Sequence, residues 1–107
     1  MHPTSTARDW NGVEVFHDRV IPYLQKFSDA MHRHDVPVCC QITHRGRRGR
    51  SIDLWNRMYG PSDVREPNHR ENPHPLEPKM IDELVEAFAA AAYRLKQGGF
   101  DGCEVNA

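Results

Sequence analysis

Two stretches of the chain repeat apolar residues at the spacing of an amphipathic helix. In the first, which runs from about Asp18 to His34, the steps are four, four, three and four residues, so the apolar side chains share one stripe: Phe16, Val20, Leu24, Phe27 and Met31. Pro22 lacks a backbone N–H, which predicts that regular helix begins only a few residues before it, with Asp18 as the N-cap.

The second helical pattern begins near Pro78, a residue suited to a first helical turn. Its apolar positions follow the i, i+3, i+4, i+7 spacing: Ile81, Leu84, Val85, Phe88, Ala92 and Leu95. Gly98 and Gly99 provide the C-terminal cap.

A short run typical of a strand follows each predicted helix. Residues 36–42 are mostly apolar and do not alternate with polar residues, which predicts a strand buried on both faces of a parallel sheet. Residues 100–106 form the second predicted strand. Residues 1–12 are polar and read as a loop.

Residues 44–76 form a predicted loop of some thirty residues, far longer than the usual connection of about four to six. Such a loop inside a compact domain is functional or disordered. The element order is therefore helix, strand, long loop, helix, strand, which predicts an α/β fold with parallel strands. Two parallel strands leave both sheet edges open, which indicates that the chain is a piece of a larger α/β domain.

Composition and charge narrow the function classes. The chain has 107 residues, a formal net charge of −1 and three cysteines. This balance argues against a globally basic nucleic-acid binder, and no apolar run approaches the ~20 residues of a membrane span. The cysteines make no disulfide framework, so a reducing cytoplasm is the expected location.

Two amides stand at the ends of the predicted strands. Gln41 and Asn106 lie near the carboxyl ends of their strands, where parallel sheets bind ligands. Gln41 is either a ligand-binding residue or a core glutamine bonded to backbone; these alternatives are evenly balanced on the pattern alone. Glu104 shares a face with Asn106 one pleat deeper, and we expect it to be a buried structural carboxylate with a partner.

An arginine-rich segment follows the first predicted strand. Arg45, Arg47, Arg48 and Arg50 suggest either an RNA- or anion-binding module or a solvated loop balanced by Asp53, Asp63 and Glu66, and the second is favoured. No metal site is expected, because Cys39 and Cys40 point to opposite faces of a strand.

The residues at the two strand ends resemble a known family. Gln41-Ile42-Thr43-His44-Arg45-Gly46-Arg47 is similar to the Q-[LI]-x-H-x-G-R stretch of the Old Yellow Enzyme family of FMN oxidoreductases. Phe88-Ala89 with Ala91-Ala92, followed by Gly99-Phe100-Asp101-Gly102-Cys103-Glu104-Val105-Asn106, resembles its F-A-x-A-A…A-G-F-D-G-V-E-[IL]-H pattern. His2-Pro3-Thr4-Ser5 resembles the segment after its second barrel strand. The nearer branch is that of trimethylamine dehydrogenase and 2,4-dienoyl-CoA reductase.

The resemblance implies a (β/α)₈ TIM barrel, of which residues 1–107 are a partial domain from after strand two through strand four, with no second domain. It implies FMN as cofactor, bound in part by Gln41, a small-molecule substrate contacted by Asn106, and NAD(P)H as a reductant. Asn106 replaces the family's histidine, which argues against a histidine-type enone clamp. An iron–sulfur cluster in the parent protein would lie outside this segment.

The leading hypothesis is thus a fragment of an FMN-dependent NADH:flavin-type oxidoreductase, of ene-reductase or of amine dehydrogenase/demethylase type, inactive in isolation. The alternatives are the arginine-rich anion-binding module and a truncated product that folds poorly.

Overall fold

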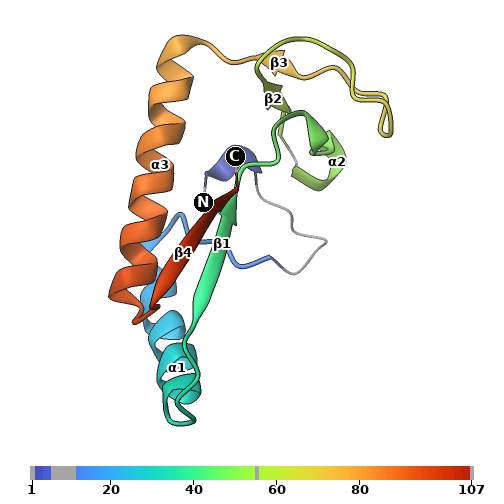
Figure 1. The fold of residues 1–107 in the computed structure, drawn as a ribbon. Coiled ribbons are helices and arrows are strands. Elements are labelled where there is room, and N and C mark those ends of the chain that lie inside the picture. Colours follow the sequence, from blue (N-terminus) through green and yellow to red (C-terminus); the bar gives the residue numbers. More distant parts are fainter. Residues whose placement is uncertain (1, 6–11, 55, 107) are drawn as a thin grey trace.

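The chain forms a β–α–β unit around one pair of parallel strands (Figure 1). The computed structural model describes all residues except 1, 6–11, 55 and 107. Strand β1 (Cys39–Thr43) pairs with β4 (Gly102–Asn106), and helix α3 (Pro78–Gln97) connects them. Helix α1 (Ile21–His32) precedes β1 and packs on α3. The α/β class and the parallel strand direction are therefore confirmed.

The long connection between β1 and α3 contains short elements of its own. It includes a 3₁₀ turn (Gly46–Arg48), helix α2 (Ser51–Leu54) and the two-residue strands β2 (Tyr59–Gly60) and β3 (His74–Pro75). Strands β2 and β3 pair in parallel, and hydrogen bonds extend the pairing from the His74 N–H to the Met58 carbonyl (2.8 Å) and from the Leu76 N–H to the Gly60 carbonyl (2.8 Å). The pairing thus joins the middle of the predicted loop to its carboxyl end.

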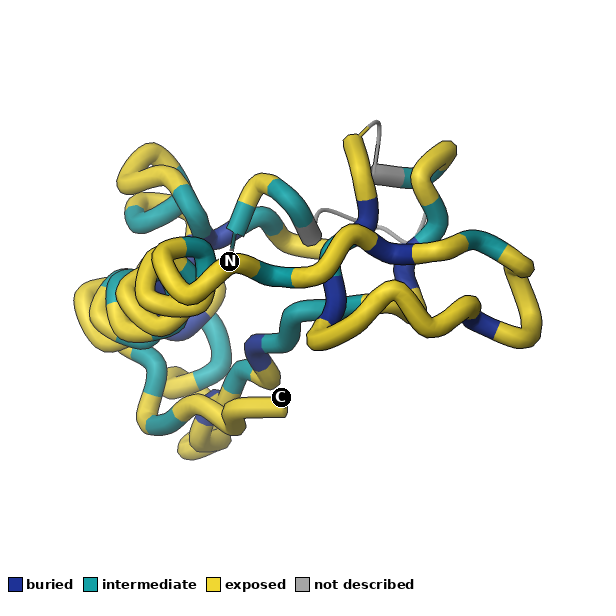
Figure 2. The backbone as a smooth tube through the Cα atoms, turned by 90° about the horizontal axis from the view of Figure 1, so that it is seen from above, coloured by how far each residue is buried: buried dark blue, intermediate teal, exposed yellow. Residues whose placement is uncertain are grey.

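The hydrophobic core lies on one side of the β1–β4 sheet only. It consists of Val15, Leu24, Ile42, Ala91 and Leu95, with Val20, Cys40, Phe88, Ala92 and Phe100 packed around it. Figure 2 shows exposed residues along the last part of β4, near the C-terminus, and buried ones where the helices meet β1. Both α1 and α3 contribute to this core, so both belong to the same helical layer.

The prediction that residues 36–42 are buried on both faces is wrong. Ile42 is 2% exposed, but its neighbours Cys39 and Gln41 are exposed. The helices of this chain cover the face of Ile42 and leave the other face uncovered. The strand itself begins later than expected, at Cys39.

The predicted start of α1 is partly confirmed. Regular helix begins at Ile21, immediately before Pro22, as the missing N–H requires. Asp18, however, does not cap it: the N-cap position is Val20, and Asp18 begins a 3₁₀ turn (Asp18–Val20). Its carboxylate instead accepts a hydrogen bond from the Arg94 Nε at 2.6 Å, which joins the turn before α1 to α3.

The end of α3 packs closely against α1. Gly98 caps α3 as predicted, and a Cβ atom added there would lie 2.5 Å from the Leu24 Cβ. The hydroxyl of Ser28, a buried residue, donates to the Gly98 carbonyl at 2.6 Å. Gly99 adopts the left-handed conformation (φ 77°), which lets the chain turn from α3 into β4.

Asp101 fastens the amino ends of the two strands together. Its carboxylate accepts hydrogen bonds from the Val38 N–H (2.7 Å) and from the His32 ring (2.8 Å), and its own N–H donates to the Val38 carbonyl (2.9 Å). The Val38 N–H and the His32 side chain lower the pKa of Asp101 from its ordinary value. The register of β1 against β4 is therefore set where both strands begin.

The contact between the helices yields a stability prediction. Gly98→Ala forces the Leu24 side chain to move, so we expect a loss of about 1–3 kcal/mol in the free energy of unfolding, measured by chemical denaturation of the complete protein that carries these residues. Gln97→Ala, at an exposed side chain in the same turn, is the control and should change it by less than about 0.5 kcal/mol. Equal effects of the two substitutions would contradict the close packing.

Candidate functional site

The uncovered face of the β1–β4 sheet carries mostly polar side chains. Side chains alternate along a strand, so Cys39, Gln41 and Thr43 share this face. The register pairs these three residues with Gly102, Glu104 and Asn106 of β4, respectively. The core residue Ile42 lies on the opposite face. Both predicted amides are therefore on the same face of neighbouring strands.

The register places the two amides at different heights. Gln41 is level with Glu104, and Asn106 is level with Thr43. Asn106 thus lies one pleat, about 6.6 Å, closer than Gln41 to the carboxyl ends of the strands. The expectation that Gln41 and Asn106 occupy equivalent positions on their strands is therefore wrong. The residue opposite Asn106 is Thr43.

The expectation of a buried Glu104 is wrong within this chain. Glu104 is exposed, because no helix of the chain covers its face of the sheet. Its carboxylate instead belongs to the same polar face as Gln41, directly across the strand pair.

Gln41 is not a core glutamine held by backbone groups. Its residue is exposed, and its side chain has no hydrogen-bond partner in the part of the chain that the structure describes. An amide offers two donor hydrogens and an acceptor oxygen on one planar group. Gln41 and Asn106, which is also exposed, can therefore present both kinds of partner to a planar polar ligand at this face.

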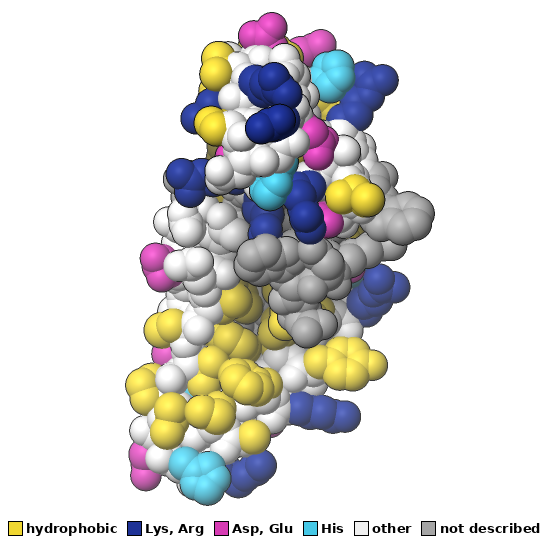
Figure 3. All heavy atoms as spheres, turned by 90° about the vertical axis from the view of Figure 1, so that its right-hand side faces the viewer, with side chains coloured by type: hydrophobic (Ala, Val, Ile, Leu, Met, Phe, Trp, Pro, Cys, Tyr) yellow, Lys and Arg dark blue, Asp and Glu magenta, His cyan; other side chains and the backbone are white. Residues whose placement is uncertain are grey.

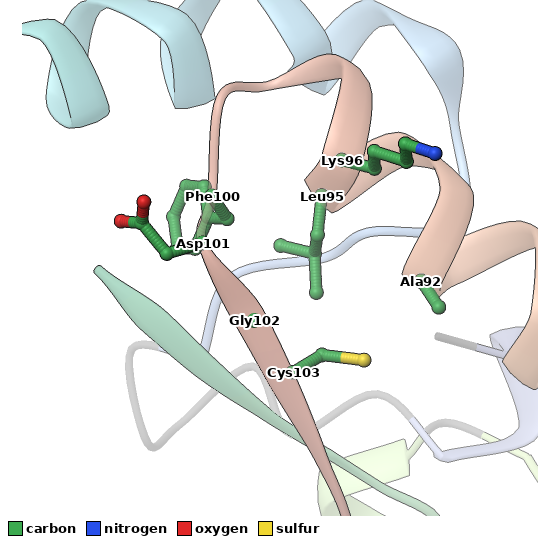
Figure 4. A pocket seen from close by; sticks show the side chains of 7 residues that line it. All are labelled: Ala92, Leu95, Lys96, Phe100, Asp101, Gly102 and Cys103. Atoms are coloured by element: carbon green, nitrogen blue, oxygen red, sulfur yellow. The ribbon is translucent and has the colours of Figure 1, made fainter. Parts of the chain in front are cut away.

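The face of the sheet that is turned toward the helices is more apolar and more buried. Burial raises the pKa of the Cys40 thiol, and its register partner Cys103 acts in the same direction. A hollow of about 300 Å³ lies beside Cys103, and Figure 4 shows its lining by α3 and the start of β4: Ala92, Leu95, Lys96, Phe100, Asp101, Gly102 and Cys103. This hollow is on the other face from the two amides, so it is not part of their site.

Two arginines of the arginine-rich segment interact with acidic residues of the same loop. Arg50 forms a bidentate ion pair with Asp53, and Glu66 interacts with the charge of Arg47. These are two of the three acidic residues expected to balance the arginines. Figure 3 shows Lys, Arg and His side chains near the top of the molecule, level with this loop, and apolar side chains lower down.

Glu66 organises the turn at the far end of the loop. It is buried, and its carboxylate accepts a hydrogen bond from the His69 N–H at 2.6 Å. Its carbonyl accepts from the Arg70 N–H, and its N–H donates to the Glu71 carbonyl. The His69 N–H, followed by that of Asn68, lowers the pKa of Glu66. The side chain and the backbone of Glu66 thus close the turn together.

The described residues hold no group of three or more His, Cys, Asp or Glu side chains placed around one ion. No helix among them combines the length and apolar character needed to cross a membrane.

The residue pattern alone gives Thr43 and His44 no role in a site. Thr43 lies opposite Asn106, and His44 follows it at the end of β1. The sequence does hint at a site here, because two polar residues, Thr43 and His44, come after the buried Ile42 where the strand ends. Only the register of β1 against β4 shows which of them stands beside Asn106.

Similarity to known proteins covers the whole chain. A model of the NADH:flavin oxidoreductase / NADH oxidase family matches residues 1–107. The N,N-dimethylglycine/sarcosine dehydrogenase of Chromohalobacter salexigens is 41% identical over 99 residues, which are 92% of this chain and 14% of that protein. The multifunctional alkene reductase/demethylase OYE of Caballeronia cordobensis is 43% identical over 91 residues, or 84% of this chain and 14% of that protein.

A solved structure shares the fold. The complex of 2-naphthoyl-CoA reductase with 2-naphthoyl-CoA superimposes with a TM-score of 0.85 and 25% identity, over 97% of this chain and 18% of that one. The predicted partial barrel fold is confirmed by this likeness. The chain spans only 14% of the length of the two curated relatives.

The turn at Glu66 gives a prediction for the loop. Glu66→Ala removes the acceptor of the His69 N–H, so trypsin should cleave the folded protein after Arg65 and Arg70 several-fold faster, as followed by mass spectrometry. Glu66→Gln keeps an acceptor oxygen and should cleave at nearly the wild-type rate. The exposed Asp63→Ala is the control; equally fast cleavage in that variant would show that Glu66 has no special role.

Proposed function

Because the chain belongs to the NADH:flavin oxidoreductase / NADH oxidase family, we propose that it forms part of an FMN-dependent oxidoreductase. Residues 1–107 correspond in this proposal to the barrel segment from after the second strand through the fourth, without a second domain. The observation that carries it is the placement of Gln41 and Asn106 on one uncovered face of two parallel strands. The isolated segment is expected to be inactive, because it supplies one side of the site only.

FMN supplies hydride transfer when it is bound, and the protein supplies orientation. Gln41 fits this group, because one exposed amide pairs with both a ring N–H and a ring carbonyl, which the pyrimidine edge of a flavin presents. The resemblance of the Gln41–Arg47 stretch to the family pattern supports the same role. In this role the Gln41 amide would hold and orient the bound group through hydrogen bonds.

Asn106 is proposed to orient the substrate, one pleat nearer the strand ends than Gln41. Its amide binds a carbonyl or carboxylate oxygen but, unlike a histidine, does not serve as an acid near neutral pH. The relatives are named as a dimethylglycine/sarcosine dehydrogenase and as an alkene reductase/demethylase. We therefore favour a small N-methylated amine that carries a carboxylate as substrate, with an activated alkene as the alternative.

NAD(P)H as electron donor and a cytoplasmic location complete the proposal. They rest on the name of the family and on the free thiols of Cys39, Cys40 and Cys103. The arginine-rich anion module is not carried further, because Arg50 is paired within the loop and Arg47 interacts with Glu66.

The cofactor role of Gln41 is tested in the complete protein that carries these residues. We expect it to purify with bound FMN, and Gln41→Leu should weaken FMN binding about tenfold, because two hydrogen bonds are lost. Titration of the apoprotein followed by flavin fluorescence measures this affinity. Gln97→Leu, at an exposed position on α3, is the matched control. Wild-type protein that binds no FMN would overturn the proposed function.

The substrate role of Asn106 predicts a different kinetic signature. Asn106→Ala should raise KM about tenfold at unchanged FMN content, because a substrate hydrogen bond worth about 1.4 kcal/mol is lost. Steady-state kinetics with sarcosine, dimethylglycine and cyclohexenone measure this effect and identify the substrate class. Asn68→Ala, in the exposed loop, is the control. Loss of FMN without a change in KM would assign Asn106 to the cofactor instead.

A further inference from the structure

A chain of hydrogen bonds connects a 3₁₀ turn near the N-terminus (Pro3–Ser5) to the residue that follows β1. The Nε2 atom of His44 lies 3.2 Å from the Thr4 Oγ1, which lies 2.7 Å from the Nδ1 atom of His2. The other ring nitrogen of His44, Nδ1, accepts a hydrogen bond from the Gly46 N–H at 3.1 Å. His2, Thr4 and His44 are each half-buried. We call this group the His44–Thr4 clamp.

The donors in the clamp have only one consistent arrangement. The Gly46 N–H can only donate, so Nδ1 of His44 carries no proton and the neutral ring carries its proton on Nε2. That proton is donated to the Thr4 hydroxyl oxygen. Nδ1 of His2 accepts a hydrogen bond from the Thr4 N–H at 3.3 Å, so it is an acceptor and also accepts the hydrogen bond that the Thr4 hydroxyl donates. Both imidazoles are therefore neutral when the clamp is formed.

The surroundings of the two rings favour the neutral forms. Burial lowers the pKa of His44, and the neighbouring His2 acts in the same direction. Burial also lowers the pKa of His2, against the opposing effect of Glu83 on α3. The electrostatics thus agree with the arrangement that the hydrogen-bond geometry requires.

The clamp lies at the end of the sheet where the candidate site lies. His44 directly follows Thr43, the register partner of Asn106. Figure 1 shows the N-terminal turn near the carboxyl end of β1, where Thr4 contacts His44. Gly46 reaches back to His44 from a left-handed conformation (φ 54°), so the backbone after β1 is bent sharply at this point.

We propose that His44 is a positioning residue, which through Thr4 holds the Pro3–Ser5 turn against the end of β1 and so fixes the rim beside Asn106. This role rests on the proposed function of Asn106. Imidazole suits it, because one rigid ring accepts from Gly46 and donates to Thr4 at the same time. Thr4 and His44 are 40 residues apart in the sequence, and the hydrogen bond between them holds the turn and the end of β1 in contact.

The test uses the complete protein with four variants. Thr4→Val removes the hydroxyl at nearly constant shape, and Thr4→Ser restores it. His44→Asn keeps an acceptor near the Gly46 N–H but loses the donor to Thr4, whereas His44→Gln keeps an amide donor near the position of Nε2. We expect Thr4→Val and His44→Asn to raise KM about fivefold at unchanged FMN content and nearly unchanged kcat. Thr4→Ser and His44→Gln should stay within about twofold of wild type.

Hydrogen exchange of the Thr4 amide provides a readout that does not depend on activity. It should be faster in Thr4→Val and His44→Asn and unchanged in the two conservative variants. Unchanged exchange in Thr4→Val, or faster exchange with an unchanged KM, would overturn the positioning role. Wild-type protein that binds no FMN would instead overturn the proposed function, while the exchange data would still show whether the clamp forms.

Discussion

Parallel pairing of β1 with β4 in a single register is the constraint on which the rest of the structure depends. It places Ile42 on the side of the helices, where it meets Leu24, Ala91 and Leu95, and it places Gln41 on the opposite side. Because side chains alternate along a strand, a slip of one residue would exchange the two sets. The core and the polar face are therefore determined by the same hydrogen bonds.

Different hydrogen-bonding groups hold the two ends of this strand pair. At the amino ends, the Asp101 carboxylate binds the Val38 N–H and the His32 ring, and the Gly98–Ser28 contact brings α1 close to the end of α3. At the carboxyl ends, neutral imidazole and hydroxyl groups connect His44 to the N-terminal turn. In barrels of this class the amino end serves stability and the carboxyl end carries the chemistry. The distribution of contacts in this chain follows that division.

The uncovered face of the sheet explains why Gln41, within the strand expected to be buried on both faces, and Glu104 are exposed. An apolar strand such as residues 36–42 is typical of a strand covered on both sides, and Glu104 within a strand is typical of a partnered buried carboxylate. In this chain only α1 and α3 cover the sheet, and they cover one face. Gln41 and Glu104 are exposed for that reason. The chain spans 14% of the length of the two curated relatives that it matches.

The sequence by itself determined the two long helices, the two central strands and their order, but not the short elements within residues 44–76. Apolar spacing, Pro22 and Pro78, and the Gly98–Gly99 pair are local signals, so both helices and both strands could be predicted near their observed bounds. The quoted motifs also sufficed to indicate the family. Only the tertiary structure decided that Thr43 rather than Gln41 stands opposite Asn106, that Asp18 pairs with Arg94 instead of capping α1, and that Thr4 meets His44. The members of each pair lie 40 or more residues apart in sequence. Their meeting depends on strand register and helix packing, which no local pattern of residues encodes.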